Sequence, residues 1–454
     1  MQTAKKIMEI VENDLQEGVS LEVVRGGRKK KAAAEDNDAV DRFMRSYKPE
    51  YRLRKQALLA RLETHPLYVE PAADVSQTQR FGWNRGLALK LETLIRGRWI
   101  AWLDIIQKGA YAPEDNIPEC EMDMFDGTDK VNKMLDKCMN TAFHNGYRGH
   151  DFLEWLGYSL GIAWFEKPKI DERTWNHWYE TFDLSLMLLY PSDYLSTFLL
   201  THAGQSGVGA YFPTPINITK MIHQMLGGGQ EDEERTVSVF EPCLGGGAML
   251  LPSRSLNLIG ADFNMTMVKA AAIQAFLYQP WLLYTPTPIV GIHFSAEEMR
   301  MHRYFEFDTN TRIYCGDSLL GEYRAPADIF QDGDEWIDIY LSPLDLSKNS
   351  ALQVEKDFLT VDWADMTREM KWNIVKAQSR CFGFDRGVSN PPFGATNKYT
   401  MERIRELQKS NTELLAKRQE WLDTLQKLAH PQVEQAVETA MYVINEKTGQ
   451  MSFF

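Results

Sequence analysis

The sequence is poor in cysteine and has no paired cysteine motif. Only five cysteines occur in 454 residues, and no two of them have the CxxC spacing: Cys120, Cys138, Cys243, Cys315 and Cys381. Such scattered thiols argue against a zinc site and against a disulfide framework. We therefore predict no bound metal and a reducing, cytoplasmic environment.

Long hydrophobic runs are also missing. No apolar stretch reaches the roughly 20 residues that a helix needs to cross a bilayer. Residues 1–18, MQTAKKIMEIVENDLQEG, lack the apolar centre of a secretory signal peptide and are typical of a short amphipathic helix. These features predict a chain without a membrane segment.

An excess of positive charge is absent as well. The formal net charge is −13, and a protein that wraps nucleic acid is usually basic. Two local clusters run against this trend, namely RGGRKKK at 25–31 and the residues Arg80, Arg85, Arg96 and Arg98, which lie among aromatic residues. Each cluster is either a nucleic-acid contact or, as we favour, a solvated face or a linker.

The spacing of apolar residues divides the chain into four parts. Residues 1–40 are predicted to be a helix followed by a basic linker, and residues 41–205 have the three- and four-residue spacing of a mainly helical domain. Residues 206–400 alternate between strand and helix patterns, with an insertion at about 321–382. Residues 401–454 begin with a long charged helix and end in a tail.

Four strand patterns occur in the third part, at 236–243, 256–263, 311–320 and 383–390, and a helical pattern at 264–279 follows the second strand. Strands that alternate with helices form parallel, doubly wound sheets. The predicted fold class is therefore α/β, with a parallel sheet preceded by a mainly helical domain.

A glycine-rich loop follows the first predicted strand in FEPCLGGGAMLL, residues 240–251. The strand ends at Glu241, and the glycines 245–247 allow positive φ and close approach of the backbone to a ligand. At the carboxyl end of a first strand, α/β sheets bind nucleotides. The loop has neither GK[ST] nor GxGxxG, so by itself it is equally an ordinary strand–helix turn.

Acidic residues end the next two predicted strands. Asp262 lies 17 positions after Gly245 and is placed to accept hydrogen bonds from ribose hydroxyls. Phe263 beside it can cover one face of an adenine ring. Asp317, in YCGDSL, can accept from an adenine amino group. The three strand ends together indicate a nucleotide site better than any one of them does.

The fourth predicted strand leads into SNPPF. Two prolines make a stiff, extended turn, so that the Pro391 carbonyl and the Asn390 side chain are rigid acceptors. Two such acceptors can receive both hydrogens of an exocyclic amino group, and Phe393 can stack on the ring that carries it. This is a way to hold a base that has been flipped out of a helix.

Five segments together resemble the gamma group of S-adenosylmethionine-dependent amino methyltransferases that act on adenine N6 in DNA. The similarity is greatest to the modification subunits of type I restriction systems and their type IIG relatives. In the order of that group, the segments are YFPTP (211–215), FEPCLGGGAML (240–250), GADFN (260–264), GDSL (316–319) and SNPPFG (389–394).

The resemblance implies a Rossmann-like methyltransferase sheet, S-adenosylmethionine as cofactor, DNA as partner and the cytoplasm of a bacterium or of a phage-infected bacterium. Adenine would be bound by Asn390, Pro391, Pro392 and Phe393. The implied cofactor contacts are Tyr211, Thr214, Pro215, Glu241, Gly245, Gly247, Asp262, Phe263 and Asp317. Thr214 and Pro215 would line the methionine end of the cofactor.

The chain differs from this group in two places. The insertion at 321–382 is longer than the usual crossover, and only 60 residues follow Gly394, where the group has three more strands and a target-recognition region. A sheet that stops after its fourth strand leaves three alternatives. A second subunit completes it, the helical N-terminal region substitutes, or the protein is a binding subunit without catalysis. Methylation of cytosine N4 or of a protein glutamine also stays open.

The last five residues, QMSFF, resemble the peptides by which bacterial DNA enzymes dock on the sliding clamp. Gln450, Met451, Phe453 and Phe454 would form the docking group on a free tail. The alternative is a terminal strand that packs its two phenylalanines into the core.

Overall fold

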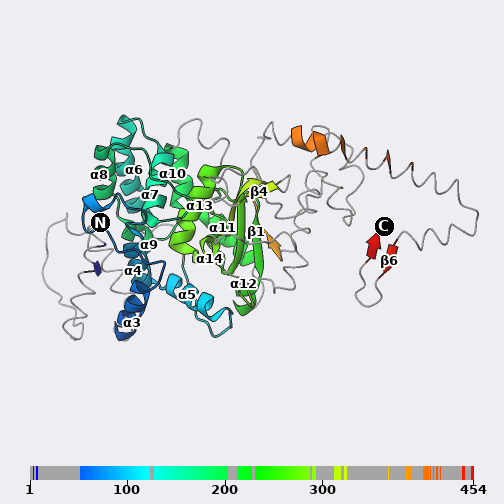
Figure 1. Cartoon of the computed structure of the whole chain (residues 1–454), viewed down its shortest axis with the longest axis horizontal. Coiled ribbons are helices and arrows are strands. Elements are labelled where there is room, and N and C mark those ends of the chain that lie inside the picture. Colours follow the sequence, from blue (N-terminus) through cyan, green and yellow to red (C-terminus); the bar gives the residue numbers. More distant parts are fainter. Residues whose placement is uncertain are drawn as a thin grey trace, which may run out of the picture. The chain divides into compact units, whose positions relative to one another are not determined.

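The computed structural model describes most of the chain up to residue 318 and shorter stretches beyond it (Figure 1). The described residues are 4, 7, 8, 52–122, 127–202, 212–226, 231–286, 289–292, 311–318, 322–324, 367, 385–390, 402–407, 409, 410, 413, 416, 417, 420, 442–444 and 451–453. The chain divides into two compact units. Residues 1–340 and 382–395 form the first, and residues 341–381 and 396–454 form the second.

The first unit begins with a helical region, as the apolar spacing predicted. Its helices are α3 (Arg52–Glu63), η2 (Val75–Gln77), α4 (Arg85–Ile95), α5 (Arg98–Lys108), α6 (Thr128–His144), α7 (Gly149–Leu160), α8 (Glu172–Thr181), α9 (Leu184–Leu189) and α10 (Tyr194–His202). Asp171 and Asp183 cap α8 and α9 by accepting from backbone N–H groups of the first turn. Such caps stabilise a helix by about 1 kcal/mol each.

Aromatic side chains fill the core of this helical region. Trp83, Trp102, Trp155 and Trp178 are almost completely buried. The Trp155 ring lies 5.7 Å from both the Trp83 and the Trp178 ring, in tilted arrangements that the quadrupoles of aromatic rings favour. The tryptophans of the N-terminal half thus have a packing role.

A five-stranded sheet follows, and its strand order is β4-β3-β2-β1-β5. The strands are β1 (Ser238–Glu241), β2 (Asn257–Asp262), β3 (Ile313–Asp317), β4 (Glu322–Arg324) and β5 (Arg386–Gly387). β5, β1, β2 and β3 are mutually parallel, with Ser238 opposite Asn257 and Val239 opposite Arg386. The predicted α/β class and parallel sheet are confirmed, with helices on both sides of the sheet.

Four more helices belong to this part of the unit: α11 (Ile216–Leu226), α12 (Glu231–Thr236), α13 (Met265–Tyr278) and α14 (Pro280–Leu283). α13 is the helix that the pattern at 264–279 predicted, and Asn264 caps it. α13 is buried along its length from Met267 to Tyr278. It packs on β2 and β3 and also on α7, α9 and α10 (Figure 1). The boundary predicted near residue 205 therefore lies inside one compact unit.

The structure differs from the sequence prediction at both edges of the sheet. β4 is antiparallel to β3, a strand that the pattern did not predict. At the opposite edge, no strand of the described residues pairs with the outer side of β5. β5 is held to β1 by Asp385, whose Oδ2 accepts from the Ser238 N–H and hydroxyl, both at 2.8 Å.

The second unit contains helical residues at 402–407 and a hairpin of β6 (Tyr442–Ile444) and β7 (Met451–Phe453). Met451 to Phe453 thus lie in a strand and not on a free tail. Among the described residues, no helix combines the length and the apolar character needed to cross a membrane.

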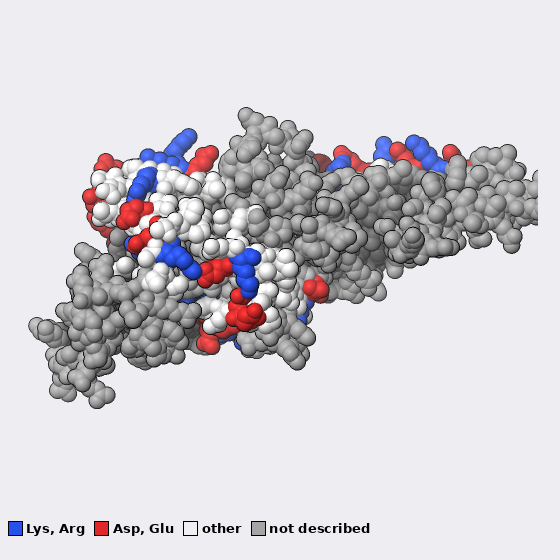
Figure 2. All heavy atoms as spheres, turned by 60° about the horizontal axis from the view of Figure 1, so that its bottom comes forward, with Lys and Arg blue, Asp and Glu red and all other residues white. Residues whose placement is uncertain are grey.

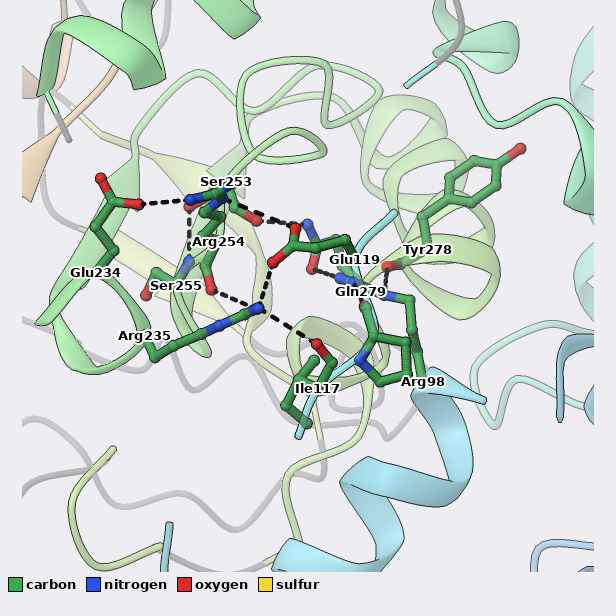
Figure 3. Close-up of polar contacts among 11 residues, drawn as sticks. Arg98, Ile117, Glu119, Glu234, Arg235, Ser253, Arg254, Ser255, Tyr278 and Gln279 are labelled. Carbon is green, nitrogen blue, oxygen red and sulfur yellow. Dashed lines mark hydrogen bonds and ion pairs between the residues drawn. The ribbon is translucent and has the colours of Figure 1, made fainter. Parts of the chain in front are cut away.

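A polar network joins the helical region to the amino ends of β1 and β2 (Figure 3). Arg235, at the end of α12, donates to the Glu119 carboxylate at 2.5 Å and to the Ile117 and Arg254 carbonyls. Arg98, the first residue of α5, donates to the Tyr278 carbonyl at 2.9 Å. It also donates to the Gln279 side chain at 3.1 Å and to the Pro118 carbonyl.

The four arginines that lie among aromatics have internal partners. Arg85 donates to the Leu160 carbonyl at 2.8 Å, and Arg80 and Arg96 donate to the carbonyls of Glu70 and Leu188. On the face drawn in Figure 2, basic and acidic side chains are interspersed over the described residues. Arg98 is buried and Arg85 and Arg96 are half-buried, so these three serve the fold rather than forming the solvated face that we favoured, whereas Arg80 is exposed, as that prediction has it.

Candidate functional site

The predicted site residues meet at one edge of the sheet. β1 ends at Glu241, β2 at Asp262 and β3 at Asp317, and Asn390 follows β5. Because the four strands are parallel, their carboxyl ends lie on the same side. The strand order reverses between β1 and β5, and α/β sheets bind ligands beside such a reversal.

The glycine loop turns sharply at the end of β1. Gly245 and Gly247 have φ angles of 54° and 95°, a region that residues with a Cβ rarely adopt. The Leu244 N–H donates to the Ala261 carbonyl at 2.8 Å, and this bond holds the loop against β2. Gly245 and Gly247 are thus explained by the geometry of the turn.

Asp262 is bound to this loop by two backbone hydrogen bonds. Its Oδ2 accepts from the Gly245 N–H and its Oδ1 from the Asn264 N–H, both at 2.7 Å. Burial raises the pKa of Asp262 to about 6, and the two bonds counteract that rise. Each carboxylate oxygen can accept more than one hydrogen bond, so capacity remains for a pair of ligand hydroxyls.

Glu241 is 1% exposed and lacks a partner for one oxygen. Its Oε2 has no hydrogen-bond partner among the described residues. Burial, together with the nearby charges of Asp262 and Asp193, raises the pKa of Glu241 well above its usual range. An unpartnered buried carboxyl is costly, and such groups concentrate where a ligand supplies the missing donor.

Two residues that the sequence did not single out support the loop from behind. The Gln274 side chain, on α13, donates from Nε2 to the Asp193 carboxylate at 2.8 Å and to the Gly246 carbonyl at 2.6 Å. Its Oε1 accepts from the Tyr194 and Leu195 N–H groups at the start of α10. Gln274 therefore fixes the glycine loop to α10.

Gly246 lies tightly against Ser196 of α10. A Cβ built on Gly246 would lie 2.2 Å from the Ser196 hydroxyl oxygen. A side chain there would require the Ser196 hydroxyl to rotate away or α10 to shift. No sequence motif marks Asp193 or Gln274, because their role depends on where α10 and α13 cross the loop.

The third strand end lies beside the first. The Ser318 hydroxyl donates to the Pro242 carbonyl at 2.5 Å, so the segment after Asp317 is bound to the glycine loop. Asp317 is buried, as expected for a side chain at the sheet edge. Phe263 follows Asp262 and is 53% exposed, so its ring is available to a ligand.

The first and last of the resembling segments are joined by a hydrogen bond. The Asn390 Nδ2 donates to the Phe212 carbonyl at 3.0 Å, across 178 positions of the chain. A hydrogen bond from Ser389 also reaches the Cys243 thiol, whose pKa burial raises to about 12. The structure thus brings the segments at 212, 243 and 390 together.

Thr214 and Pro215 stand between Phe212 and α11. The Pro215 carbonyl accepts from the Ile218 and Thr219 N–H groups, which places both residues at the start of that helix. Tyr211, Pro391, Pro392 and Phe393 lie outside the described residues, as do Gln450 and Phe454.

The site is acidic and contains no metal centre in the part of the chain that is described, where no cluster of three His, Cys, Asp or Glu could hold an ion. Its carboxylates suit a ligand with hydroxyl groups and positive charge. No protein-family model, curated protein or solved structure matches the chain. The function is therefore argued from the residues themselves.

Proposed function

We propose that the protein is a DNA adenine-N6 methyltransferase that uses S-adenosylmethionine. The observation that carries the proposal is the hydrogen bond between Asn390 and the Phe212 carbonyl. It links the predicted base-binding segment to the segment predicted to hold the methionine end of the cofactor. A methyl donor and an acceptor amino group must meet at such a junction.

The residues at the carboxyl edge fit this cofactor. The orphaned Glu241 Oε2 can accept from a cationic donor, and Asp262, already fixed by two backbone bonds, can accept from a ribose diol. We expect the Asp317 carboxylate and the exposed Phe263 ring to bind the adenine of the cofactor. The strand order β3-β2-β1-β5 supports a Rossmann-like binding mode at the reversal.

When bound, S-adenosylmethionine supplies a methyl group on a positively charged sulfur. Glu241, Asp262, Asp317 and Phe263 would hold it so that this methyl group could pass to the adenine N6, with the neutral thioether as the leaving group and a proton released from N6. Asn390 orients the amino group, because its Nδ2 donates to Phe212 and leaves Oδ1 as the accepting atom of the amide. In-line placement of the two reactants supplies much of the rate.

A second candidate function is a methyltransferase-like subunit that binds without catalysis, or one part of a split enzyme. Two observations favour it. No described strand lies beyond β5, and the net charge is −13. Cytosine N4 and a protein glutamine are the other possible acceptors, because an amide acceptor does not distinguish one exocyclic amino group from another.

Calorimetric titration of the whole protein with S-adenosylmethionine, with and without DNA, is the first test. Binding is expected, and its absence in both titrations would overturn the enzyme proposal. Methyl transfer from tritiated cofactor to unmethylated, amplified DNA is the second test. Transfer should be lost in Asn390→Ala, while exposed Phe143→Ala, on α6, serves as the control. Binding without transfer by the wild type would favour the non-catalytic subunit.

The clamp-docking prediction is tested separately, because Met451 and Phe453 lie in β7, which pairs with β6. Deletion of residues 450–454 should abolish the capture of a purified bacterial sliding clamp by the immobilised protein. Capture at the wild-type level after the deletion would remove the clamp from the proposed partners, which otherwise are DNA and a subunit that completes the sheet.

A further inference from the structure

We propose that the Glu241 carboxyl group is protonated in the free protein and loses this proton when the cationic cofactor binds. Binding of the cofactor is then coupled to the release of one proton into the solvent. The inference rests on the proposed function and deepens it, because it assigns the state of the site before the ligand is bound. Glu241 ends β1, directly before the glycine loop, and is 1% exposed.

Two further carboxyl groups that act on Glu241 are attached to the glycine loop. Asp262 accepts from the Gly245 N–H at 2.7 Å. Asp193 accepts from the Gln274 side chain at 2.8 Å, and the same Nε2 donates to the carbonyl of the next glycine at 2.6 Å. The negative charges of Asp262 and Asp193 both act on Glu241. Three carboxyl groups thus share a small region around the glycine loop.

Glu241 lacks a compensating group in the part of the chain that the structure describes. Its Oε2 has no hydrogen-bond partner there, and both charges that act on it are negative. The thiol of Cys243 also lies within electrostatic reach of Glu241. Burial raises the pKa of this thiol to about 12, so it is neutral near pH 7 and offers no charge of either sign.

The basic groups of the neighbouring elements have other partners. Lys269, on α13, forms an ion pair with a glutamate of α7. Arg386, on β5, acts on His223 of α11. Residues 388–390, which follow β5 beside the end of β1, are Val, Ser and Asn and carry no charge. We therefore expect the positive charge that Glu241 lacks to come from a ligand.

These surroundings favour the neutral form of Glu241. A buried carboxylate without a donor, beside two like charges, is strongly disfavoured relative to the protonated acid. Burial and the two charges raise the pKa of Glu241 well above its usual range, whereas burial raises the pKa of Asp262 to about 6. At pH 7, Asp262 is thus mostly ionised and can accept from a ribose diol, while Glu241 holds a proton.

A positively charged ligand reverses the balance at Glu241. An opposite charge within about 4–6 Å favours the ionised form of a carboxyl group, whether or not the two groups form a hydrogen bond. S-adenosylmethionine has two such charges, the sulfonium and the α-ammonium. The O–H bond of Glu241 breaks, its proton passes to the solvent, and the carboxylate then balances the charge of the ligand. The site thereby favours a cationic ligand over a neutral nucleoside.

The test is calorimetric titration of the whole protein with S-adenosylmethionine in buffers of different ionisation enthalpy, which counts the protons released. The wild type should release about one proton per bound ligand at pH 7, and its association constant should rise up to about tenfold from pH 6.5 to pH 7.5. Glu241→Gln should bind more weakly and release almost none. Glu180→Gln is the matched control, because Glu180 is exposed on α8, and it should match the wild type.

Two related ligands show which charge displaces the proton. S-adenosylhomocysteine lacks the sulfonium charge, and adenosine lacks both charges. Release with S-adenosylhomocysteine as well would assign the effect to the ammonium group, and release with S-adenosylmethionine alone would assign it to the sulfonium, so either result supports the inference. Adenosine should bind weakly and release no proton. Equal release with adenosine would overturn the inference.

Binding of the cofactor by the wild type without proton release would overturn the inference and leave the proposed function standing. A wild type that binds no cofactor would overturn both. The infrared difference spectrum between the free and the bound protein identifies the group. The band of a protonated carboxyl should disappear on binding in the wild type, and the same loss in Glu241→Gln would overturn the assignment. The proton count of the wild type does not depend on the folding of any variant.

Discussion

At the amino ends of β1 and β2, two buried arginines each have three acceptors, whereas at the carboxyl ends one oxygen of a buried carboxyl has no donor in the described part of the chain. Arg98 and Arg235 bind oxygens of the segment 117–119, and they also bind oxygens of Tyr278 and Gln279 (Arg98) and of Arg254 (Arg235) (Figure 3). Glu241 keeps one oxygen unpartnered among the described residues, and its pKa is raised by burial and by Asp262 and Asp193. A network in which every polar group has a hydrogen-bond partner stabilises the fold, while a buried polar atom without a partner indicates where a ligand binds.

The largest loss of stability should follow from removing one of the two buried arginines at the amino ends of the strands. Arg98→Ala leaves the Tyr278 and Pro118 carbonyls and the Gln279 side chain without their donor in the interior. We expect the free energy of unfolding to fall by about 3–5 kcal/mol in urea denaturation. Arg254→Ala is the control, because Arg254 is 48% exposed and its ion pairs are 3.8 Å long. Arg254→Ala should lower the free energy of unfolding by less than about 1 kcal/mol. Equal losses in the two variants would contradict the comparison.

The second largest effect is a dependence of stability on pH, caused by Asp262 at the carboxyl ends of the strands. The pKa of Asp262 is about 6 in the folded protein, above its usual value of 3.8, so the folded state holds this proton more tightly. The stability it contributes is complete below pH 3.8 and is lost as the pH rises through about 6. Between pH 4 and pH 7, the free energy of unfolding of the wild type should fall by up to about 3 kcal/mol relative to that of Asp262→Asn. A difference between the two that does not change with pH would show that Asp262 is not responsible.

The smallest expected effect is a gain in stability, caused by a substitution of Glu241. Glu241→Gln keeps the shape of the side chain but removes its ionisation. Since the pKa of Glu241 is raised, the wild type loses stability as the pH increases, and the variant does not lose this part. We expect a gain of about 1 kcal/mol over the wild type at pH 8, together with weaker S-adenosylmethionine binding in calorimetry. A destabilised variant would mean that Glu241 is a structural residue like Arg98.

The sequence predicted the parts of this molecule that depend on local patterns. Strand and helix periodicity identified β1, β2, β3 and α13, and the 17-residue interval from Gly245 to Asp262 corresponds to a hydrogen bond in the structure. The position of Asp262 at the edge of the sheet was predictable because Asp262 ends one strand and Gly245 lies in the loop after the neighbouring strand.

Contacts between distant elements were not predictable in the same way. Gln274 lies in the middle of an apolar helix, and only the crossing of α10 and α13 shows that it binds the glycine loop. The same holds for Arg98, which resembled a surface charge but is buried at the carboxyl end of α13. Antiparallel β4 has too few residues for a recognisable pattern.

The attachment of β5 to β1 has a consequence for how the protein is made. The Asp385 carboxylate that binds Ser238 is synthesised 147 residues after it. At translation speeds of about 5–20 residues per second, β1 waits about 7–30 s for this partner. Until then its outer edge is an unpaired template for other strands, and Asn390, the proposed base-binding residue, has not yet been synthesised. The nascent chain is therefore able to order its helical region and glycine loop before the segment that carries Asn390 is made.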